Sequence, residues 1–337
     1  MRRKAVLWEK TGQGKIHCFL CAHNCQIGED DYGFCGMRQN IGGELFTYAY
    51  GSVIANHVDP IEKKPLYHFL PGTYAYSIAT IGCNFRCTFC QNWTISQMSK
   101  KDGDLEGLEM KPEQVVKEAL DNDCKSISYT YTEPTIFFEY ALDTAKLAKK
   151  KGLHNNFVTN GYMTKQAVET IKPYLDAANV DLKFFNDDIY RRMCSARLQP
   201  VLDTIKNLYE AGIWVEVTTL VVPGQNDSEE ELRNIARFIS DTSRDIPWHI
   251  SRFHPDYKYS ESPATPLETM EEAKKIGEEE GLNYIYLGNV HTRAETVCPQ
   301  CGASLIDRAG FTAKISEDFT SSASCRKCGT KIAGVWK

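Results

Sequence analysis

The stretch Tyr76-Ser-Ile-Ala-Thr-Ile-Gly-Cys83-Asn-Phe-Arg-Cys87-Thr-Phe-Cys90 joins an apolar run to three closely spaced cysteines. A short apolar run that ends at a glycine is typical of a buried strand, so the thiols are predicted to lie on the loop after that strand. Three soft ligands at this spacing suit adjacent irons of one cubane cluster. A zinc loop or buried free cysteines are the alternatives, and they are disfavoured because the remaining cysteine clusters already form complete sets of four.

Around this loop, from about Tyr74 to Val290, β-rich runs alternate with helical patterns, which predicts parallel βα units. Glycines at 152, 212 and 281 each separate a helical run from the next strand, where a positive φ ends a helix at low cost. We therefore expect an α/β fold with a partial (β/α)6 TIM-like barrel. The predicted strands are Tyr76–Ile81, Ser126–Tyr131, Asn155–Val158, Asn179–Lys183, Trp214–Val222, His249–Phe253 and Tyr284–Leu287.

Two of the helices have a clear apolar face. The helix between Phe138 and Lys151 repeats its apolar residues at helical spacing, and the helix after Asp227 begins with a predicted Ser228/Glu231 capping box. In such barrels functional groups gather where strands end and loops begin. The residues that follow each apolar run are accordingly the first candidates for a site.

The CxxxCxxC loop, with Phe89 before its last cysteine, resembles the signature of the radical S-adenosylmethionine (SAM) superfamily. That resemblance implies that Cys83, Cys87 and Cys90 hold a [4Fe-4S] cluster whose open iron chelates SAM. It further implies reductive cleavage of SAM to a 5′-deoxyadenosyl radical, which abstracts hydrogen from a substrate. A low-potential electron donor of the ferredoxin or flavodoxin type is then expected as a partner.

Further motifs are similar to those of the activating enzymes of glycyl-radical enzymes. Tyr131-Thr-Glu133-Pro-Thr stands where that family has Gly-Gly-Glu-Pro, so Glu133 is implied to accept hydrogen bonds from the SAM ammonium. Tyr131 replaces a glycine there, although only glycine is indifferent to the sign of φ. Thr159-Asn160-Gly161 matches part of the Asp-Thr-Asn-Gly segment, with Val158 in place of its aspartate. Glu133 as a plain carboxylate at a helix N-terminus is the alternative.

Asp181-Leu-Lys183 matches the Asp-Leu-Lys run that lines the SAM pocket in the same enzymes, and His254 matches their late barrel histidine. Alternating residues of a strand share one face, so Asp181 and Lys183 can act together. The alternatives are an interior ion pair for Asp181 and Lys183, and ordinary packing or capping for His254. The resemblance thus implies a SAM pocket formed by Phe89, Glu133, Asn160, Asp181, Lys183 and His254.

Two four-cysteine sets flank the barrel. Cys298, Cys301, Cys325 and Cys328 form paired knuckles, each followed by glycine, which is strong evidence for a closed zinc ribbon, with rubredoxin-type iron as the second possibility. The second set, near the start of the chain, favours structural zinc, and an auxiliary iron–sulfur cluster remains open. It consists of Cys18, Cys21, Cys25 and Cys35.

The N-terminal cysteines, the run Asn56–Phe69 and the Cys83 loop together resemble the AmmeMemoRadiSam system radical SAM enzymes over nearly the whole chain. Partnership with AMMECR-type and Memo-type proteins is implied. Three parts are expected: a Cys-rich metal-binding segment at 1–72, the barrel at 73–292 and the zinc ribbon at 293–337. The two remaining cysteines, Cys124 and Cys194, are interpreted as small buried hydrophobes.

Composition narrows the classes of function. The net charge is −5, and basic residues are scattered among acidic ones, which disfavours a nucleic-acid binder or an anionic-membrane surface. Eleven of the thirteen cysteines lie at metal-ligand spacing, and no apolar segment has the length of a signal or a membrane span, which favours a cytoplasmic protein. A glycyl-radical activase is the second hypothesis. A non-catalytic electron-transfer or zinc-scaffold protein is the alternative of another class.

Overall fold

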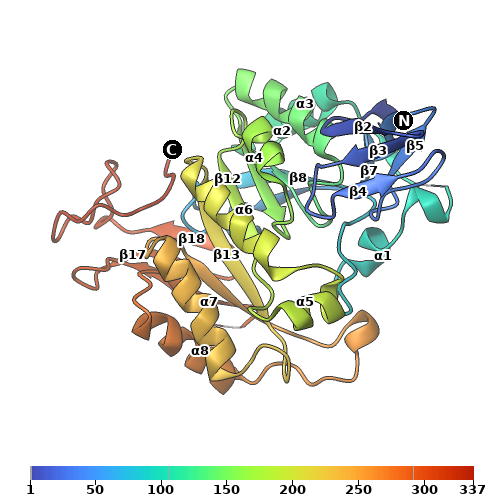
Figure 1. Ribbon diagram of the computed structural model, residues 1–337. Coiled ribbons are helices and arrows are strands. Elements are labelled where there is room, and N and C mark those ends of the chain that lie inside the picture. Colours follow the sequence, from blue (N-terminus) through green and yellow to red (C-terminus); the bar gives the residue numbers. More distant parts are fainter. Residues whose placement is uncertain (1, 105, 291) are drawn as a thin grey trace.

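The computed structural model describes residues 2–104, 106–290 and 292–337. Its centre is a nine-stranded sheet in the order β15-β14-β13-β12-β11-β10-β8-β7-β9, in which the seven strands from β8 to β15 are parallel (Figure 1). The parallel strands are β8 (Tyr74–Thr80), β10 (Ser126–Tyr129), β11 (His154–Thr159), β12 (Ala177–Asp181), β13 (Trp214–Val221), β14 (Trp248–Arg252) and β15 (Ile285–Gly288).

Helices connect these strands as six βα units, and β15 follows the last of them, so the expected partial barrel is confirmed. The helices are α2 (Pro112–Asp121), α3 (Phe138–Lys150), α4 (Lys165–Ile171), α5 (Asp187–Cys194) with α6 (Leu198–Glu210), α7 (Glu229–Thr242) and α8 (Leu267–Glu279). A short helix, α1 (Trp93–Ser96), follows the cysteine loop. None of the helices that the structure describes has the length and apolar character of a membrane span.

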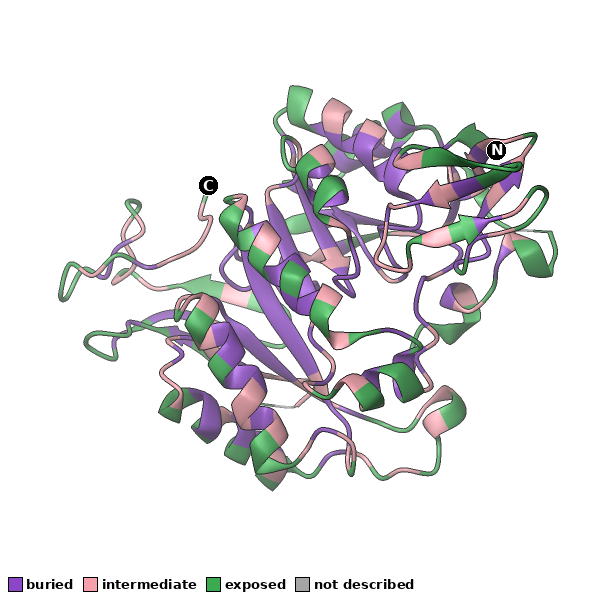
Figure 2. Ribbon diagram, in the orientation of Figure 1, coloured by how far each residue is buried: buried purple, intermediate pink, exposed green. Residues whose placement is uncertain are grey.

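The strands are buried on both faces, which explains why they read as near-continuous apolar runs rather than alternating ones. Every residue of β10 is buried, and the central parallel strands of the sheet are mostly purple in Figure 2. Gly152, Gly212 and Gly281 all have positive φ, as predicted from their positions after α3, α6 and α8. Ser228 caps α7, but the Glu231 carboxylate accepts from the Phe185 amide instead of completing the predicted capping box.

The N-terminal segment forms two small antiparallel sheets and then enters the main sheet. One sheet contains β2 (Trp8–Gly12), β3 (Lys15–Cys18) and β4 (Cys25–Ile27), and the other β1 (Arg3–Lys4), β5 (Arg38–Ile41) and β6 (Glu44–Thr47). The next strand, β7 (Ser52–Pro60), pairs antiparallel with β8 and with β9 (Leu108–Glu109). Arg38 and Glu139 form a buried ion pair between this segment and α3.

The C-terminal residues form the antiparallel strands β16 (Ala294–Val297), β17 (Ser304–Ala309) and β18 (Thr312–Ile315) and then return to residues 66–70. Val335 bridges Phe69, and its amide donates to the His68 carbonyl at 2.7 Å. The Glu216 carboxylate, near the start of β13, accepts from the Tyr67 and His68 amides. The ribbon and residues 66–70 therefore pack at the N-terminal end of the barrel, which leaves the C-terminal ends of the strands to the site.

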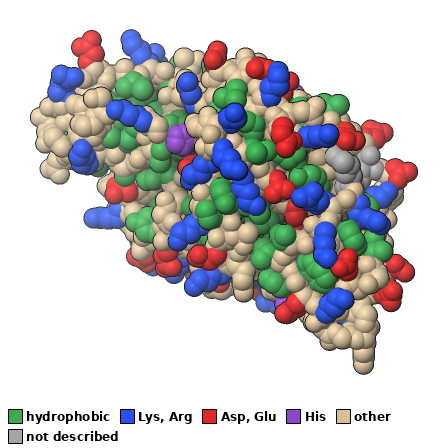
Figure 3. Space-filling model, turned by 90° about the horizontal axis from the view of Figure 1, so that it is seen from above, with side chains coloured by type: hydrophobic (Ala, Val, Ile, Leu, Met, Phe, Trp, Pro, Cys, Tyr) green, Lys and Arg blue, Asp and Glu red, His purple; other side chains and the backbone are tan. Residues whose placement is uncertain are grey.

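Charges of both signs are interspersed on the surface shown in Figure 3, which agrees with the mild net charge of −5.

Candidate functional site

A cavity of about 560 Å³ opens at the C-terminal ends of the parallel strands, where the barrel architecture is expected to place its site. The Cys83 loop forms one side, and residues at the ends of β10, β11 and β12 form the floor. Eight of the nine residues proposed for the cluster and SAM line this cavity, although they come from four separate parts of the chain. They are Cys83, Cys87, Phe89, Cys90, Glu133, Asn160, Asp181 and Lys183.

The cysteine loop is held at its backbone. Two of its amides, from Arg86 and Thr88, donate to the carbonyls of Cys194 and Met193 at the end of α5, at 2.8 and 2.9 Å. The sulfurs are hydrogen-bonded as well: the Phe85 amide donates to Cys83 Sγ at 3.3 Å, and Ser96 Oγ pairs with Cys90 Sγ at 3.2 Å. Hydrogen bonds to sulfur are one of the means by which proteins adjust an iron–sulfur cluster.

Glu133 connects the ends of two strands. Its carboxylate accepts from the Thr135 amide and hydroxyl at 3.0 and 2.5 Å, from the Thr159 hydroxyl at 2.7 Å and from the Asn160 amide at 2.8 Å. Among the described residues, Oε2 receives only the Asn160 amide, so it retains capacity for a further donor. Burial raises the pKa of Glu133, while these hydrogen bonds oppose that rise. The side chain thus has a structural role beyond that of a plain helix-terminal carboxylate.

Asn160 lies against the cysteine loop itself. Its side-chain amide donates to Asn84 Oδ1 at 2.7 Å and lies 3.7 Å from Cys83 Sγ. Among the described residues, Asn84 Nδ2 is a buried donor without a hydrogen-bond partner. A sulfur-rich group next to Cys83 would supply acceptors for such donors. The polar surroundings of this thiol therefore fit an iron–sulfur cluster.

Asp181 and Lys183 form an ion pair with Nζ 2.8 Å from Oδ2, and their side chains are 33% and 13% exposed. The Lys183 ammonium also lies 6.0 Å from the centre of the Phe89 ring, and Phe89 packs edge-on to Phe184. Because both polar groups face the cavity, they can meet a ligand that carries a carboxylate and hydroxyls. The arrangement places a polar ion pair beside the cysteine loop.

His254 is placed differently from the other eight residues. It is exposed and lies outside the cavity lining formed by the described residues. Its Nε2 is 2.8 Å from the side-chain nitrogen of Gln91, which does line the cavity. His254 is thus adjacent to the rim of the site and reaches it through Gln91.

Beside the ends of β8 and β10, Tyr131, Lys63 and Lys64 surround Asp59 and form a polar wall of the cavity, which the sequence motifs did not assign to the SAM pocket. Tyr131 has φ 62°, the left-handed conformation that favours glycine, and its hydroxyl donates to Asp59. Asp59 also accepts from Lys63 and Lys64, at 2.8 and 2.7 Å, and the Lys64 ammonium lies 4.6 Å from the centre of the Tyr131 ring. Backbone strain of this kind is common at functional sites. The unexpected tyrosine in the glycine position was the available signal.

Burial also changes the pKa values of the charged groups in this wall. Desolvation lowers the pKa of Lys64 to about 8, although the adjacent Asp59 carboxylate opposes the effect. For Asp59 the balance goes the other way, because hydrogen bonds from both lysines and from Tyr131 hold its pKa far below the usual range despite burial. Lys63, Lys64 and Tyr131 line the cavity, so they give it a polar wall.

Cys194 lies closer to the loop than its interpretation as an inert hydrophobe suggests. A hydrogen bond between the Cys194 and Cys87 side chains is the largest cause of the raised pKa of Cys87, followed by burial. Cys194 is fully buried at the end of α5 and lies outside the lining of the cavity, while Cys87 lines it. Cys87 therefore lies between the cavity, which it lines with Cys83 and Cys90, and this fourth thiol.

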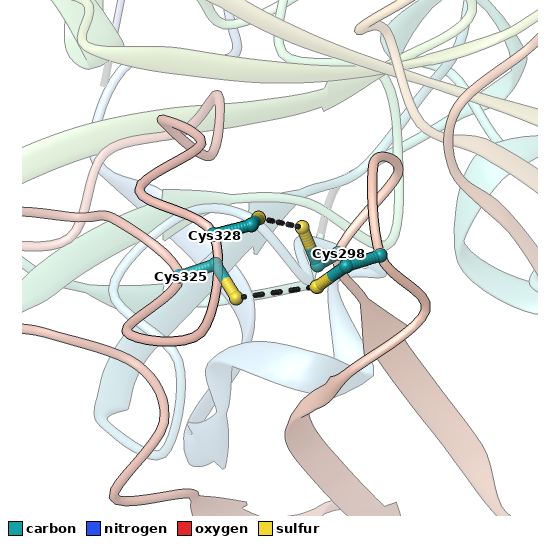
Figure 4. Close-up of side chains that lie close together, drawn as sticks. Cys298, Cys325 and Cys328 are labelled. Atoms are coloured by element: carbon teal, nitrogen blue, oxygen red, sulfur yellow. Dashed lines mark hydrogen bonds between the residues drawn. The ribbon is translucent and has the colours of Figure 1, made fainter.

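The C-terminal cysteines converge on one point. Their four sulfurs lie within 4.8 Å of one another, with Cys298 to Cys328 at 3.5 Å and Cys301 to Cys325 at 3.6 Å (Figure 4). The glycines after the two knuckles, Gly302 and Gly329, both have positive φ, as the tight turns require. A tetrahedral ion with metal–sulfur bonds of about 2.3 Å separates its sulfurs by roughly 3.8 Å. The group is therefore suited to a single metal ion.

The N-terminal cysteines surround a different, smaller cavity, which Cys18, Cys21, Cys25 and Cys35 line together with the buried Arg38. Cys18 and Cys25 are cross-strand partners in β3 and β4. The segment touches the main site, because Cys21 bridges Met163, three residues after Asn160. The structure thus places this set beside the barrel and the C-terminal set at its far end.

Comparisons with known proteins agree with this geometry. Residues 77–239 match the Radical SAM superfamily. Over 333 residues the chain is 46% identical to the uncharacterized protein MJ0808 of Methanocaldococcus jannaschii, covering 98% of each chain. It is 25% identical over 219 residues to the pyruvate formate-lyase 1-activating enzyme of Escherichia coli (strain K12), covering 61% of this chain and 89% of that enzyme.

Among solved structures, SuiB of Streptococcus suis superposes with a TM-score of 0.51 at 15% identity, covering 68% of this chain and 52% of SuiB. This likeness concerns the fold alone. The three-thiol loop, the cavity at the strand ends and the matched residues agree with one another. The chain belongs to the radical SAM superfamily and is homologous to the pyruvate formate-lyase activating enzymes.

Proposed function

We propose that the protein cleaves SAM reductively and abstracts hydrogen from a protein or small organic substrate. The observation that carries the proposal is the three-thiol loop, whose cysteines all line a cavity large enough for a nucleotide-sized ligand. When bound, a reduced [4Fe-4S] cluster supplies one electron to the sulfonium of SAM, which yields methionine and a 5′-deoxyadenosyl radical. Cys83, Cys87 and Cys90 are the residues that would hold the cluster.

The other residues of the chain position the ligand. Glu133 Oε2 has a free acceptor site for an ammonium, and the ion pair of Asp181 and Lys183 can meet a carboxylate and hydroxyls. Asn160 donates toward Cys83 and is itself held by Glu133, so it connects the ligand-binding carboxylate to the cysteine loop. His254 would act only from the rim through Gln91.

Support for an activating-enzyme type of reaction comes from the relatives. Besides the Escherichia coli enzyme, a putative glycyl-radical enzyme activating enzyme of Methanocaldococcus jannaschii is 27% identical over 182 residues, 52% of this chain and 66% of that protein. Transfer of the radical to a glycine of a partner protein is therefore the second candidate. It predicts a stable glycyl radical, detectable by electron paramagnetic resonance (EPR) on the partner and not on this chain.

The proposal includes partners and setting. Cleavage of SAM needs a low-potential donor, for which a ferredoxin or flavodoxin is the natural class. AMMECR-type and Memo-type proteins are proposed partners because of the whole-chain resemblance. The free thiols of the three sets need a reducing compartment, which favours the cytoplasm. For the C-terminal set we propose zinc, because a closed tetrahedral site folds a small appendage that lacks a large core.

The test uses the full chain, reconstituted anaerobically with iron and sulfide, reduced with dithionite and incubated with SAM. We expect 5′-deoxyadenosine and methionine from the wild type and neither from Cys87→Ala. Cys124→Ala is the matched control, because Cys124 is a buried thiol outside the three sets. If both products are absent while the cluster is intact by EPR, the protein is instead an electron-transfer or scaffold protein.

A further inference from the structure

The two four-cysteine sets differ in the spacing of their sulfurs. Within the described part of the chain, the C-terminal set is the one group of three or more Cys, His, Asp or Glu ligand atoms that lie within 4.8 Å of one another. The N-terminal sulfurs are therefore spread more widely than a single tetrahedral ion holds its ligands, which is roughly 3.8 Å apart for zinc. This spacing argues against the structural zinc that the sequence favoured.

The cysteine loop of the SAM site provides an internal comparison. The sulfurs of Cys83, Cys87 and Cys90, which are the proposed ligands of a four-iron cluster, do not form such a closely spaced group either. A polynuclear cluster binds each thiolate through a different iron, so its ligands stand further apart than those of one ion. The N-terminal set thus shares the wide spacing of the SAM loop rather than the narrow spacing of the ribbon.

The space between the N-terminal thiols is small and lined by all four cysteines. Cys18, Cys21, Cys25 and Cys35 border a cavity of about 20 Å³, more than the roughly 10–15 Å³ that one water needs. The remaining lining is mostly apolar, with Leu20, Ile27, Phe34 and Ile136 among it, and water would find few partners there. A centre of this kind suits a soft, sulfur-bridged group.

Each of the four sulfurs has an N–H donor against it. Arg38 Nη1 lies 3.5 Å from Cys18 Sγ, and the Phe34 amide lies 3.4 Å from Cys25 Sγ. Backbone amides of His23 and of Met37 and Arg38 are directed at the sulfurs of Cys21 and Cys35. The guanidinium of Arg38 is only 2% exposed and brings a positive charge beside the thiols. Such donors stabilise the negative charge of thiolate-bound clusters.

The segment between the two sites consists of side chains in direct contact. His23, two residues after Cys21, has its Nε2 2.7 Å from the carbonyl of Asn84, which follows Cys83. The His23 ring stacks on Phe34 at 4.1 Å between centroids. The Arg86 side chain in turn donates to the Phe34 carbonyl at 2.9 Å and to the Cys83 carbonyl at 2.8 Å. Two short routes therefore join the thiol sets.

From this geometry we propose that Cys18, Cys21, Cys25 and Cys35 bind a second iron–sulfur cluster, which exchanges electrons with the SAM site across His23 and Phe34. One electron enters from the low-potential donor, reduces this cluster and passes to the cluster at the Cys83 loop. The route avoids the main cavity, which SAM and the substrate would fill during turnover. The electron-transfer role rests on the proposed function, whereas occupancy by a cluster does not.

The decisive protein combines Cys83→Ala, Cys87→Ala and Cys90→Ala in the full chain, reconstituted anaerobically with iron and sulfide. We expect it to retain iron and acid-labile sulfide in equal amounts, together with the EPR signal of a reduced cluster. Zinc in place of iron, or iron without sulfide, would overturn the proposal. This readout needs no SAM cleavage, so the proposed function can fail while the second cluster stands, and the reverse is equally visible.

A complementary variant guards against misfolding of the triple variant. Cys25→Ser with Cys35→Ser in the otherwise wild-type chain is expected to lose about half of the iron and sulfide and to keep the cluster of the Cys83 loop. In the fully reduced wild type, the two clusters are expected to broaden each other's EPR signals, and each variant is expected to show a narrower signal. Two zinc ions per wild-type chain would contradict the assignment.

Discussion

Gly161 closes the turn that carries Asn160 into the site, and Gly161→Ala is expected to damage both stability and SAM binding. Its φ is +69°, and an added Cβ would lie 2.6 Å from Val180 Cγ1 in β12 and 3.2 Å from Val201 Cγ1 in α6. Both neighbours are fully buried, so they have little room to move. The turn has to shift, and Asn160 shifts with it.

The magnitude follows from two contributions. A side chain in the left-handed region costs about 1–2 kcal/mol, and overpacking a closed core adds about 1–3 kcal/mol. Gly152→Ala is the matched control, because Gly152 has φ +76° and no atom of the described residues lies within 4 Å of the added Cβ. The Gly152→Ala variant therefore carries the backbone strain without the overpacking. The difference in unfolding free energy between the two variants therefore isolates the overpacking of about 1–3 kcal/mol.

The assay is urea unfolding of both variants, paired with equilibrium binding of SAM to the reconstituted proteins. Gly161→Ala is expected to be the less stable and to bind SAM more weakly, whereas Gly152→Ala, on the far side of α3, is expected to bind as the wild type does. Equal stability of the two variants, or unchanged SAM affinity in Gly161→Ala, would refute the argument that this turn is fixed by Val180 and Val201.

Three further results are expected. Burial lowers the pKa of His68 from its ordinary 6.5 to about 4. Between pH 6.5 and 4 the unfolded chain therefore binds more protons than the folded protein, and about 3 kcal/mol of stability is lost as the pH falls through this range. The His68→Gln variant should show a flatter pH dependence in urea titrations. The control variant His57→Gln, at an exposed histidine, should keep the dependence of the wild type, and parallel curves for all three proteins would contradict the prediction. Cys194→Ser should keep the iron of the Cys83 loop, and its loss would identify Cys194 as a ligand. Chelation should remove the zinc proposed for the C-terminal set, whose Cys301 and Cys328 are exposed. It should also increase hydrogen exchange in β16–β18 without loss of iron, and unchanged exchange would show that the metal does not stabilise these strands.

Much of the fold was predictable because the parallel strands bury both faces. Each predicted run from Tyr76–Ile81 to Tyr284–Leu287 overlaps a strand of the sheet, with ends that differ by a few residues. Local rules also predicted the glycines after α3, α6 and α8. The predicted capping box was only half right, because the Glu231 carboxylate bonds to the Phe185 amide, which is 46 residues away in the chain and cannot be predicted from local sequence. It donates to Glu231 from a neighbouring loop, and such competition is visible only after folding.

The candidate site was likewise predictable where it depends on local sequence and not where it depends on contacts between distant segments. The thiol loop and the paired positions of Asp181 and Lys183 follow from local spacing and from the two-residue period of a strand. The polar wall of Asp59, Lys64 and Tyr131 does not, because β7 and the end of β10 meet only across β8. Likewise, the sequence treated Cys194 as inert, and the packing of α5 under the cysteine loop brought it to Cys87.

The sequence by itself determined which residues can bind metal and where strands, helices and turns begin, because thiol spacing, apolar periodicity and glycine placement act over a few neighbouring residues. Only the tertiary structure decided how far apart the sulfurs of each set lie, which polar groups face the cavity and which thiol set adjoins the SAM site. Those properties depend on contacts between segments that are distant in the chain. The free-energy cost of burying a polar group, and the hydrogen bonds that offset it, arise only when these segments pack together.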